Sequence, residues 1–145
     1  MLPYGKQVIV ISQASTTNAA TATGNIDTQG YDYATIDVIM ATSNDTTNNP
    51  TVFKLAECDT TVVTSFANIT AAVGDGTGGF TIPAAVTSGN WGMKFNVDLR
   101  GKKRYLKLSI SPLTTQVITA IANLFRGDEL PVDTTKANVK ALVNL

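Results

Sequence analysis

The feature that most constrains the fold is strict alternation of apolar and polar residues in the segment WGMKFNVDLR, residues 91–100. Successive side chains of a β-strand point to opposite faces of its sheet, so every second residue shares one face. The apolar face here carries Trp91, Met93, Phe95, Val97 and Leu99. The segment RYLKLSIS, residues 104–111, repeats the pattern. Both segments predict half-buried strands, and the turn RGKK between them, centred on Gly101, predicts an antiparallel hairpin.

Similar patterns predict further strands along the chain. They lie at residues 7–12, 21–27, 33–40, 51–57, 79–82 and 117–125. Residues 62–69 fit either a short strand or a helical turn. Clusters of Thr, Asn, Gly and Asp separate these segments, and such short polar side chains favour loops because they bond their own backbone. About eight short strands without long helices between them indicate an all-β fold, an antiparallel β-sandwich or a jelly-roll-like barrel.

The two ends of the chain differ from its middle. Residues 1–13 are expected to form an N-terminal arm or first strand, residues 14–126 the β-sandwich domain, and residues 127–145 a C-terminal tail. Residues 14–25 and 74–79 have few bulky apolar side chains, so they are expected to be loops at least in part. In the tail, Val139, Leu142 and Val143 have helical spacing. A short C-terminal helix and an extended arm both remain open.

The composition argues against catalysis. Histidine is absent, and Lys and Arg balance Asp and Glu at 11 each, which gives a formal net charge of zero. The chain therefore lacks the side chain best suited to proton transfer near neutral pH and the usual imidazole ligands for metals. It also lacks the basic surplus that is typical of nucleic-acid binding. We expect no enzyme activity, no cofactor, no metal ion and no direct nucleic-acid contact.

The single cysteine and the short apolar runs indicate in which cellular compartment the protein is made. Cys58 has no second cysteine for an internal disulfide, and a lone cysteine beside a strand is more typical of a small buried side chain than of a reactive thiol. No stretch approaches the roughly 20 apolar residues that span a bilayer. The first residues, MLPYGKQVIVIS, show no signal-peptide pattern. The sequence predicts a soluble protein made in a cytoplasm, with no membrane contact.

The only local excess of charge is the basic turn that follows residues 91–99. Together with Lys107 of the strand that follows, it forms a cluster of five basic residues: Arg100, Lys102, Lys103, Arg104 and Lys107. The cluster is either simply solvated, which is the favoured interpretation, or a patch that docks on an acidic surface of a partner protein or meets nucleic acid. Arg104 has the inward parity of its strand, so it is expected to reach Asp98 or an interface.

Three aromatic residues are candidates for contacts with a ligand. Tyr31 and Tyr33 share the outward parity of their strand, which leaves both open to a ligand or a partner. Together with Trp91 they would offer a platform on which a sugar ring stacks. Trp91, however, has the same inward parity as Phe95, so core packing is the better interpretation for it.

Three segments also resemble a recurrent pattern in small structural proteins encoded in the head modules of tailed bacteriophages. They are GYDYATIDVIM, FKLAECDT and FNVDLRGKKRYLKLSI, within residues 30–110. The resemblance carries no catalytic residues. It implies a capsid decoration, or cement, protein: a small β-rich domain on the outside of an assembled capsid, located in the virion after synthesis in the host cytoplasm. A protein that binds only the assembled shell stabilises that shell by mass action.

The resemblance further implies two partners, the major capsid protein and other copies of this chain, with a trimer favoured over a dimer. It also implies a terminal arm laid across a capsid subunit. MLPYGKQVIVIS is the candidate arm, able to add a strand to an exposed sheet edge. Its expected anchors are Leu2, Pro3, Tyr4 and Val8. The alternatives are a carbohydrate-binding module of a virion or tail, and a tail-tube or head-completion subunit.

Overall fold

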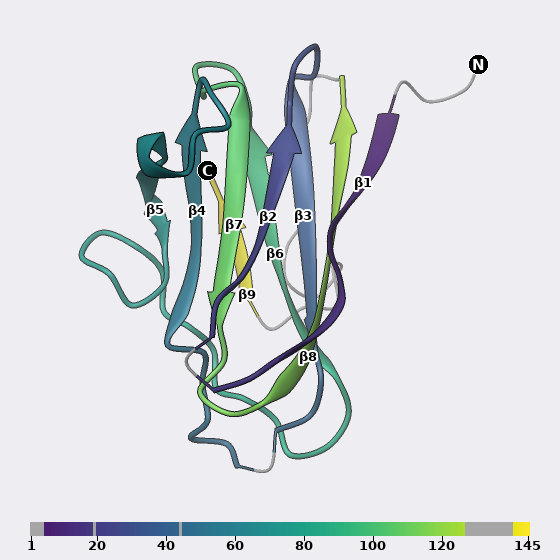
Figure 1. Ribbon diagram of the computed structural model, residues 1–145, viewed down its shortest axis with the longest axis vertical. Helices are drawn as coiled ribbons and strands as arrows, with labels where there is room; N and C mark the ends of the chain where they lie inside the picture. Colours follow the sequence, from purple (N-terminus) through teal and green to yellow (C-terminus); the bar gives the residue numbers. More distant parts are fainter. Residues whose placement is uncertain (1–4, 19, 44, 127–140) are drawn as a thin grey trace.

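The computed structural model describes residues 5–18, 20–43, 45–126 and 141–145 (Figure 1). The strands are β1 (Gly5–Thr16), β2 (Ala22–Asp27), β3 (Tyr33–Met40), β4 (Val52–Cys58), β5 (Ala67–Val73), β6 (Trp91–Asp98), β7 (Tyr105–Ser111), β8 (Gln116–Phe125) and β9 (Ala141–Asn144). A single 3-10 turn, η1 (Val63–Ser65), precedes β5. The described residues contain no α-helix, and the predicted all-β class is confirmed.

The strands form two sheets that lie face to face. Sheet A has five strands in the order β1-β8-β3-β6-β9, and sheet B has four in the order β2-β7-β4-β5. In Figure 1, β7 and β2 of sheet B cross in front of β6 and β3 of sheet A. Each sheet keeps two outer strands whose far sides pair with nothing in the described chain, so the fold is an open sandwich and not a closed barrel.

The pairing is nested in the manner of a jelly roll. β1 pairs with β8, β2 with β7, β3 with β6 and β4 with β5, all antiparallel. This is one long hairpin of paired strands that rolls up, so that successive pairs alternate between the sheets. Only β4 and β5 are neighbours both in sequence and in a sheet. The other consecutive strands from β1 to β8 cross from one layer to the other.

The core lies between the inner faces of the two sheets. The predicted inward residues of β3 and β7, such as Ile36 and Leu108, are fully buried. Three phenylalanines join the layers: Phe53 of β4, Phe95 of β6, and Phe80 from the connection between β5 and β6. Their ring centroids lie 5.6–6.2 Å apart, within the range in which aromatic rings attract each other. The aromatic cluster therefore holds both sheets and this long connection together.

The predicted hairpin between residues 91–99 and 104–111 is wrong. β6 bonds to β3 and β9 in sheet A, whereas β7 bonds to β2 and β4 in sheet B. Gly101 does adopt φ +84°, and the backbone N–H of Lys102 donates to Leu99 O, so a turn exists there. The turn leads across the sandwich. Alternation shows only which face of a strand is buried. In a sandwich that face packs against the opposite sheet, so the same pattern arises whether the two strands pair with each other or lie in different sheets.

The predicted strand at residues 79–82 is also wrong. This segment makes one isolated bridge, Gly74 to Phe80, and then continues as a loop. Asp75 has φ +54° and its carboxylate accepts the backbone N–H of Ile82 at 2.9 Å, which closes a compact turn. Pro83 follows, and since proline has no N–H it cannot extend a ladder. The expected loop at residues 74–79 lies in this turn.

Residues 62–69 and the C-terminal tail differ in how they compare with the sequence prediction. Residues 62–69 contain both alternatives, the 3-10 turn and the start of β5. Residues Ala141–Asn144, placed in a possible helix by the spacing of apolar residues, form β9, which runs parallel to β6. There Val143 is buried, and the backbone N–H of Leu145 donates to Asn96 O at 2.8 Å. Val139 lies outside the described residues.

A close approach between β1 and β2 gives a test of the edge of the sandwich. A Cβ atom on Gly24 would overlap the carbonyl oxygen of Val10, because β2 passes directly over β1 at that point. We expect Gly24→Ala to lower the free energy of unfolding by about 1–3 kcal/mol, since β1 must move away. Thr23→Ala, at an exposed neighbouring position, should change it by less than about 0.5 kcal/mol. Equal urea midpoints for the two variants would contradict the described packing.

Candidate functional site

Tyr33 is not open to a ligand, although its parity is as predicted. It pairs with Asp98 of β6 and Phe125 of β8 on the outer face of sheet A, yet only 2% of it is exposed. Its ring stacks on Phe125 at 6.0 Å, and the guanidinium of Arg100 lies 5.0 Å from the ring centroid. The two neighbouring side chains cover the ring, which an alternating pattern cannot reveal. The expectation that Tyr33 is exposed is therefore wrong.

The aromatic platform does not form. Trp91 is buried in the core, as its inward parity predicts, and its indole N–H has no hydrogen-bond partner in the described structure. Tyr31 is half-buried and packs against the edge of the core. With Trp91 and Tyr33 both buried, no pair of these rings offers a free face on which a sugar could stack.

The basic turn is largely neutralised by acidic residues of the same chain. Arg100 donates from Nε and Nη2 to the carboxylate of Asp98 at 2.7–3.2 Å, which lowers the pKa of that carboxyl group and raises the pKa of the guanidinium. Lys103 lies 3.8 Å from Asp59. Arg100 and Lys103 therefore lie in a solvated turn and pair with carboxylates of the same chain. A solvated turn was the favoured interpretation of the sequence.

Arg104 binds Asp27 and not Asp98, which corrects the sequence expectation. Its Nε and Nη2 donate to the two carboxylate oxygens at 3.0 and 2.8 Å. The hydroxyl of Thr28 also donates to the Arg104 carbonyl at 2.6 Å. Together these contacts attach the end of β2 to the connection between β6 and β7. Lys102 forms no ion pair within the described chain, and its backbone N–H donates to Leu99.

The N-terminal segment is largely part of the sandwich. Gly5–Thr16 is β1, and within it Val8 pairs with Ala122 and packs against the core of its own domain. A free arm could therefore contain only residues ahead of Gly5. Leu2, Pro3 and Tyr4 lie outside the described residues.

An apolar strip crosses the outer face of sheet A. Ile9 of β1 is 67% exposed, Ile39 of β3 46% and Val117 of β8 38%. Ile121 of β8 lies directly opposite Ile9, and Thr119 lies opposite Ile39. Diagonal neighbours in a sheet are about 7–8 Å apart, so Ile9, Ile121, Ile39 and Val117 form a diagonal apolar strip. The strip is bordered by Thr119 and by Asp37, which lies directly opposite Ile121 and pairs with Lys94. The sequence contained a signal for it: Ile39 occupies the outward phase of its strand, where polar residues are usual.

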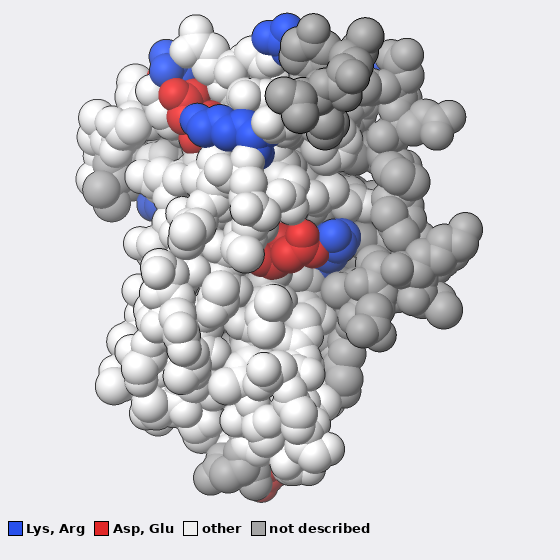
Figure 2. Space-filling view, turned by 90° about the vertical axis from the view of Figure 1, so that its right-hand side faces the viewer, with Lys and Arg blue, Asp and Glu red and all other residues white. Residues whose placement is uncertain are grey.

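The strip lies beside a free sheet edge on a side of the molecule with few charges. Among the described residues, β1 pairs only with β8 and is an outer strand of sheet A. Figure 2 views the molecule from the β1 side, and its lower half shows almost no charged residues. An unpaired strand edge offers backbone N–H and C=O groups to another chain. This side of the domain is therefore suited to protein contacts.

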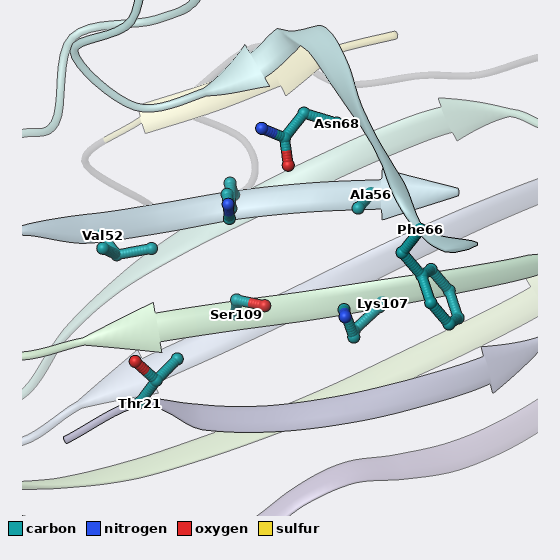
Figure 3. Close-up of a pocket in the computed structure, with 8 residues that line it drawn as sticks. Thr21, Val52, Ala56, Phe66, Asn68, Lys107 and Ser109 are labelled. Carbon is teal, nitrogen blue, oxygen red and sulfur yellow. The ribbon is translucent and has the colours of Figure 1, made fainter. Parts of the chain in front are cut away.

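A shallow groove lies on the opposite surface, the outer face of sheet B (Figure 3). Its volume is about 290 Å³. It is lined by Thr21, Val52, Lys54, Ala56, Phe66, Asn68, Lys107 and Ser109. The floor consists of Ala56 and Ser109, which face outward but are buried. In Figure 3 they lie between Asn68 and Phe66 on one side and Thr21 on the other. Lys54, Phe66 and Asn68 were not predicted as site residues, because nothing in the linear pattern brings them together.

Potential metal ligands are not clustered in the described part of the chain, and its single cysteine is buried. Its residues contain no group of three or more His, Cys, Asp or Glu side chains that could hold a metal ion. Cys58 is buried, as predicted, and the backbone N–H of Thr60 donates to its sulfur at 3.4 Å, which lowers the pKa of the thiol. The described residues contain no helix that is long and apolar enough to cross a membrane.

Comparisons with known proteins concern the fold. No protein-family model matches the sequence, and no curated protein matches it. The SPBc2 prophage-derived protein YomS has 8% identity over 86% of this chain and 95% of that chain, with a TM-score of 0.45. A structure of infectious bursal disease virus Gx strain has 14% identity over 90% of this chain and 34% of the viral chain, with a TM-score of 0.46.

A family 35 carbohydrate binding module from Clostridium thermocellum has 11% identity over 87% of this chain and 98% of that chain, with a TM-score of 0.31. At these identities and scores, none of the three structures supports an inference about function.

The Asp27–Arg104 pair predicts a specific pH dependence of stability. The hydrogen bonds from Arg104 lower the pKa of Asp27 from 3.8 to about 2 in the folded protein. The contribution of the pair is therefore complete above pH 3.8 and is lost as the pH falls through about 2. We expect Asp27→Asn to be less stable than wild type at pH 6, and this difference to shrink toward pH 2, in urea titrations. Asp59→Asn serves as the control for removing one negative charge. A constant difference for Asp27→Asn at all pH values would contradict the pairing.

Proposed function

We propose that this protein is a structural component of a tailed-bacteriophage virion, which binds the outer surface of the assembled capsid and stabilises it. The observation that carries the proposal is the apolar strip beside the free edge of β1. Two further points support it: the resemblance of residues 30–110 to small phage head proteins, and the jelly-roll topology, which viral capsid domains also use. Topology alone does not define function, so the proposal depends on the residues of the apolar strip and the edge of β1.

The strip has the properties of a contact surface. Exposed apolar side chains that adjoin one another mark interaction sites more often than scattered ones do. Burying Ile9, Ile39 and Val117 would contribute roughly 2–4 kcal/mol, on the basis of about 1.5–3 kcal/mol for each fully buried side chain. The loss of translational and rotational freedom on association costs at least as much. The strip therefore provides a weak contact by itself and needs support from other contacts.

The free edge of β1 can provide the first kind of support. Its outward backbone groups can bond to an extended segment of a capsid subunit, which would add a strand to sheet A. The register shifts near Ile9 and Ile11 interrupt the regularity of β1, and such bulges limit indiscriminate pairing of identical edges. The edge therefore suits pairing with a capsid segment whose shape matches the bulged strand. It is less suited to edge-to-edge aggregation of copies of this chain.

The second kind of support is multivalency. If several copies associate before they meet the shell, each weak contact after the first forms within one complex and at a high effective concentration. Of the closed symmetric assemblies, a trimer fits the threefold positions of a capsid lattice, so we propose a homotrimer. Sedimentation equilibrium of the purified protein should give three times the chain mass of 15.3 kDa. A monomer at all micromolar concentrations would refute the trimer.

A shell-binding assay tests the strip directly. Purified protein is mixed with decoration-free capsids, the capsids are sedimented, and bound protein is measured against its concentration. Ile9→Asp should weaken binding at least about tenfold, because a carboxylate would be buried against an apolar partner surface. Ile9 is 67% exposed, so the fold should tolerate the change, which unfolding curves can verify.

Val62→Asp is the matched control. Val62 is 55% exposed and precedes η1, which leads into β5 of sheet B, away from the strip. It should bind shells as wild type does. If both variants bind equally well, the strip is not the capsid-binding surface, and if wild type binds no shell at all, the proposed function fails.

A further inference from the structure

We propose that the groove on the outer face of sheet B binds a saccharide that carries a carboxylate, such as a hexuronic acid unit of an acidic polysaccharide. This inference does not depend on capsid binding. It rests on the charge, the polar groups and the position of the groove, and each of these restricts the chemistry of the ligand.

The charge of the lining calls for an anion. Lys54 of β4 and Lys107 of β7 lie on adjacent strands, and Lys54 pairs with Ser109, two residues from Lys107. The groove lining contains no Asp or Glu, and neither lysine forms an ion pair within the described residues. The ammonium of Lys107 lies 4.5 Å from the ring centroid of Phe66, which holds it above the groove. Two half-buried cations without counter-charges favour a ligand that supplies a carboxylate between them.

The remaining lining suits a hydroxylated ring. Asn68 and Ser109 offer an amide and a hydroxyl that can both donate and accept hydrogen bonds. The hydroxyl of Thr21 shares a hydrogen bond with Ser111 Oγ at 2.6 Å, which fixes the rim above β7. Phe66 also borders the groove, and one face of its ring is covered by the Lys107 ammonium. The volume of about 290 Å³ is near the lower end of the range for small-molecule sites, about 300 Å³.

The position of the groove argues against other anions. Its floor lies on β4 and β7, the two central strands of sheet B, whose backbone groups are paired on both sides. A peptide therefore finds no free strand edge with which to bond, and recognition must come from side chains. The lining contains no arginine, the residue typical of bidentate phosphate binding, and only one aromatic ring for a base to stack on. An acidic saccharide is the class that fits all of these features.

The groove and the apolar strip lie on opposite surfaces of the sandwich, since one is on the outer face of sheet B and the other on the outer face of sheet A. A copy attached to a shell through the strip would leave the groove facing away from that surface. The groove can therefore bind an external polysaccharide without competing for the same surface.

Isothermal titration calorimetry of the full-length protein tests the groove. Trigalacturonic acid is the probe, and the neutral galactotriose, a triglutamate peptide and inorganic phosphate are the comparison ligands. We expect binding of trigalacturonic acid only, weakened by added salt because the contact is partly ionic. Equal binding of triglutamate or phosphate would overturn the assignment to a saccharide, and no binding of trigalacturonic acid would overturn the proposal.

Substitutions locate the binding site. Lys54→Met and Lys107→Met each remove one charge while keeping an apolar stem, and each should weaken trigalacturonic acid binding about tenfold. Lys102→Met, in the turn between β6 and β7, is the matched control and should bind as wild type does. Equal affinities of all three variants would show that the saccharide binds elsewhere. Shell sedimentation with Lys54→Met should be unchanged, and Ile9→Asp should keep saccharide binding, so the two proposals can fail separately.

Discussion

The structure depends on one constraint: the apolar face of each sheet can leave water only against the apolar face of the other. The ring cluster of Phe53, Phe80 and Phe95 is the centre of that contact. Because both inner faces are used by the domain itself, every contact with another molecule has to come from the outer faces and the sheet edges. The apolar strip, the edge of β1 and the groove are all found there.

Much of the local structure could be predicted from the period of the sequence. The alternation correctly assigned the buried side of β3, β6 and β7 and of Phe53 and Leu55 in β4, including the burial of Trp91. The burial of Cys58 was expected because it is a lone cysteine, and its phase in β4 is that of the outward Lys54. The alternation could not assign strand partners, because hydrogen bonding between strands depends on the chain path and not on side-chain phase. The error at Gly101 has this cause: the turn residues are those of a hairpin, while the strands on either side belong to different layers.

The surfaces were harder to predict than the core. Tyr33 shows why, since phase placed it outward but the neighbours Phe125 and Arg100 cover it. Arg100 pairs with Asp98 two residues before it, but the partners of Lys103 and Arg104 could not be assigned in advance, because Asp59 and Asp27 come from distant segments. The groove combines residues from β4, β5, β7 and the segments before β2 and β5, so it exists only once the sheet is assembled.

The pairing of β1 with β8 has a consequence for how the chain reaches this state. Gly5 lies opposite Phe125, so β1 finds its neighbour only after β8, six strands further along the chain than β2, has been synthesised. Topologies dominated by such distant contacts have high contact order and fold in milliseconds to seconds, more slowly than helical domains. During that interval Val10 and Ile11, later buried, are exposed to solvent. Nascent chains should therefore be most prone to aggregate, and most dependent on chaperones, before β8 has emerged.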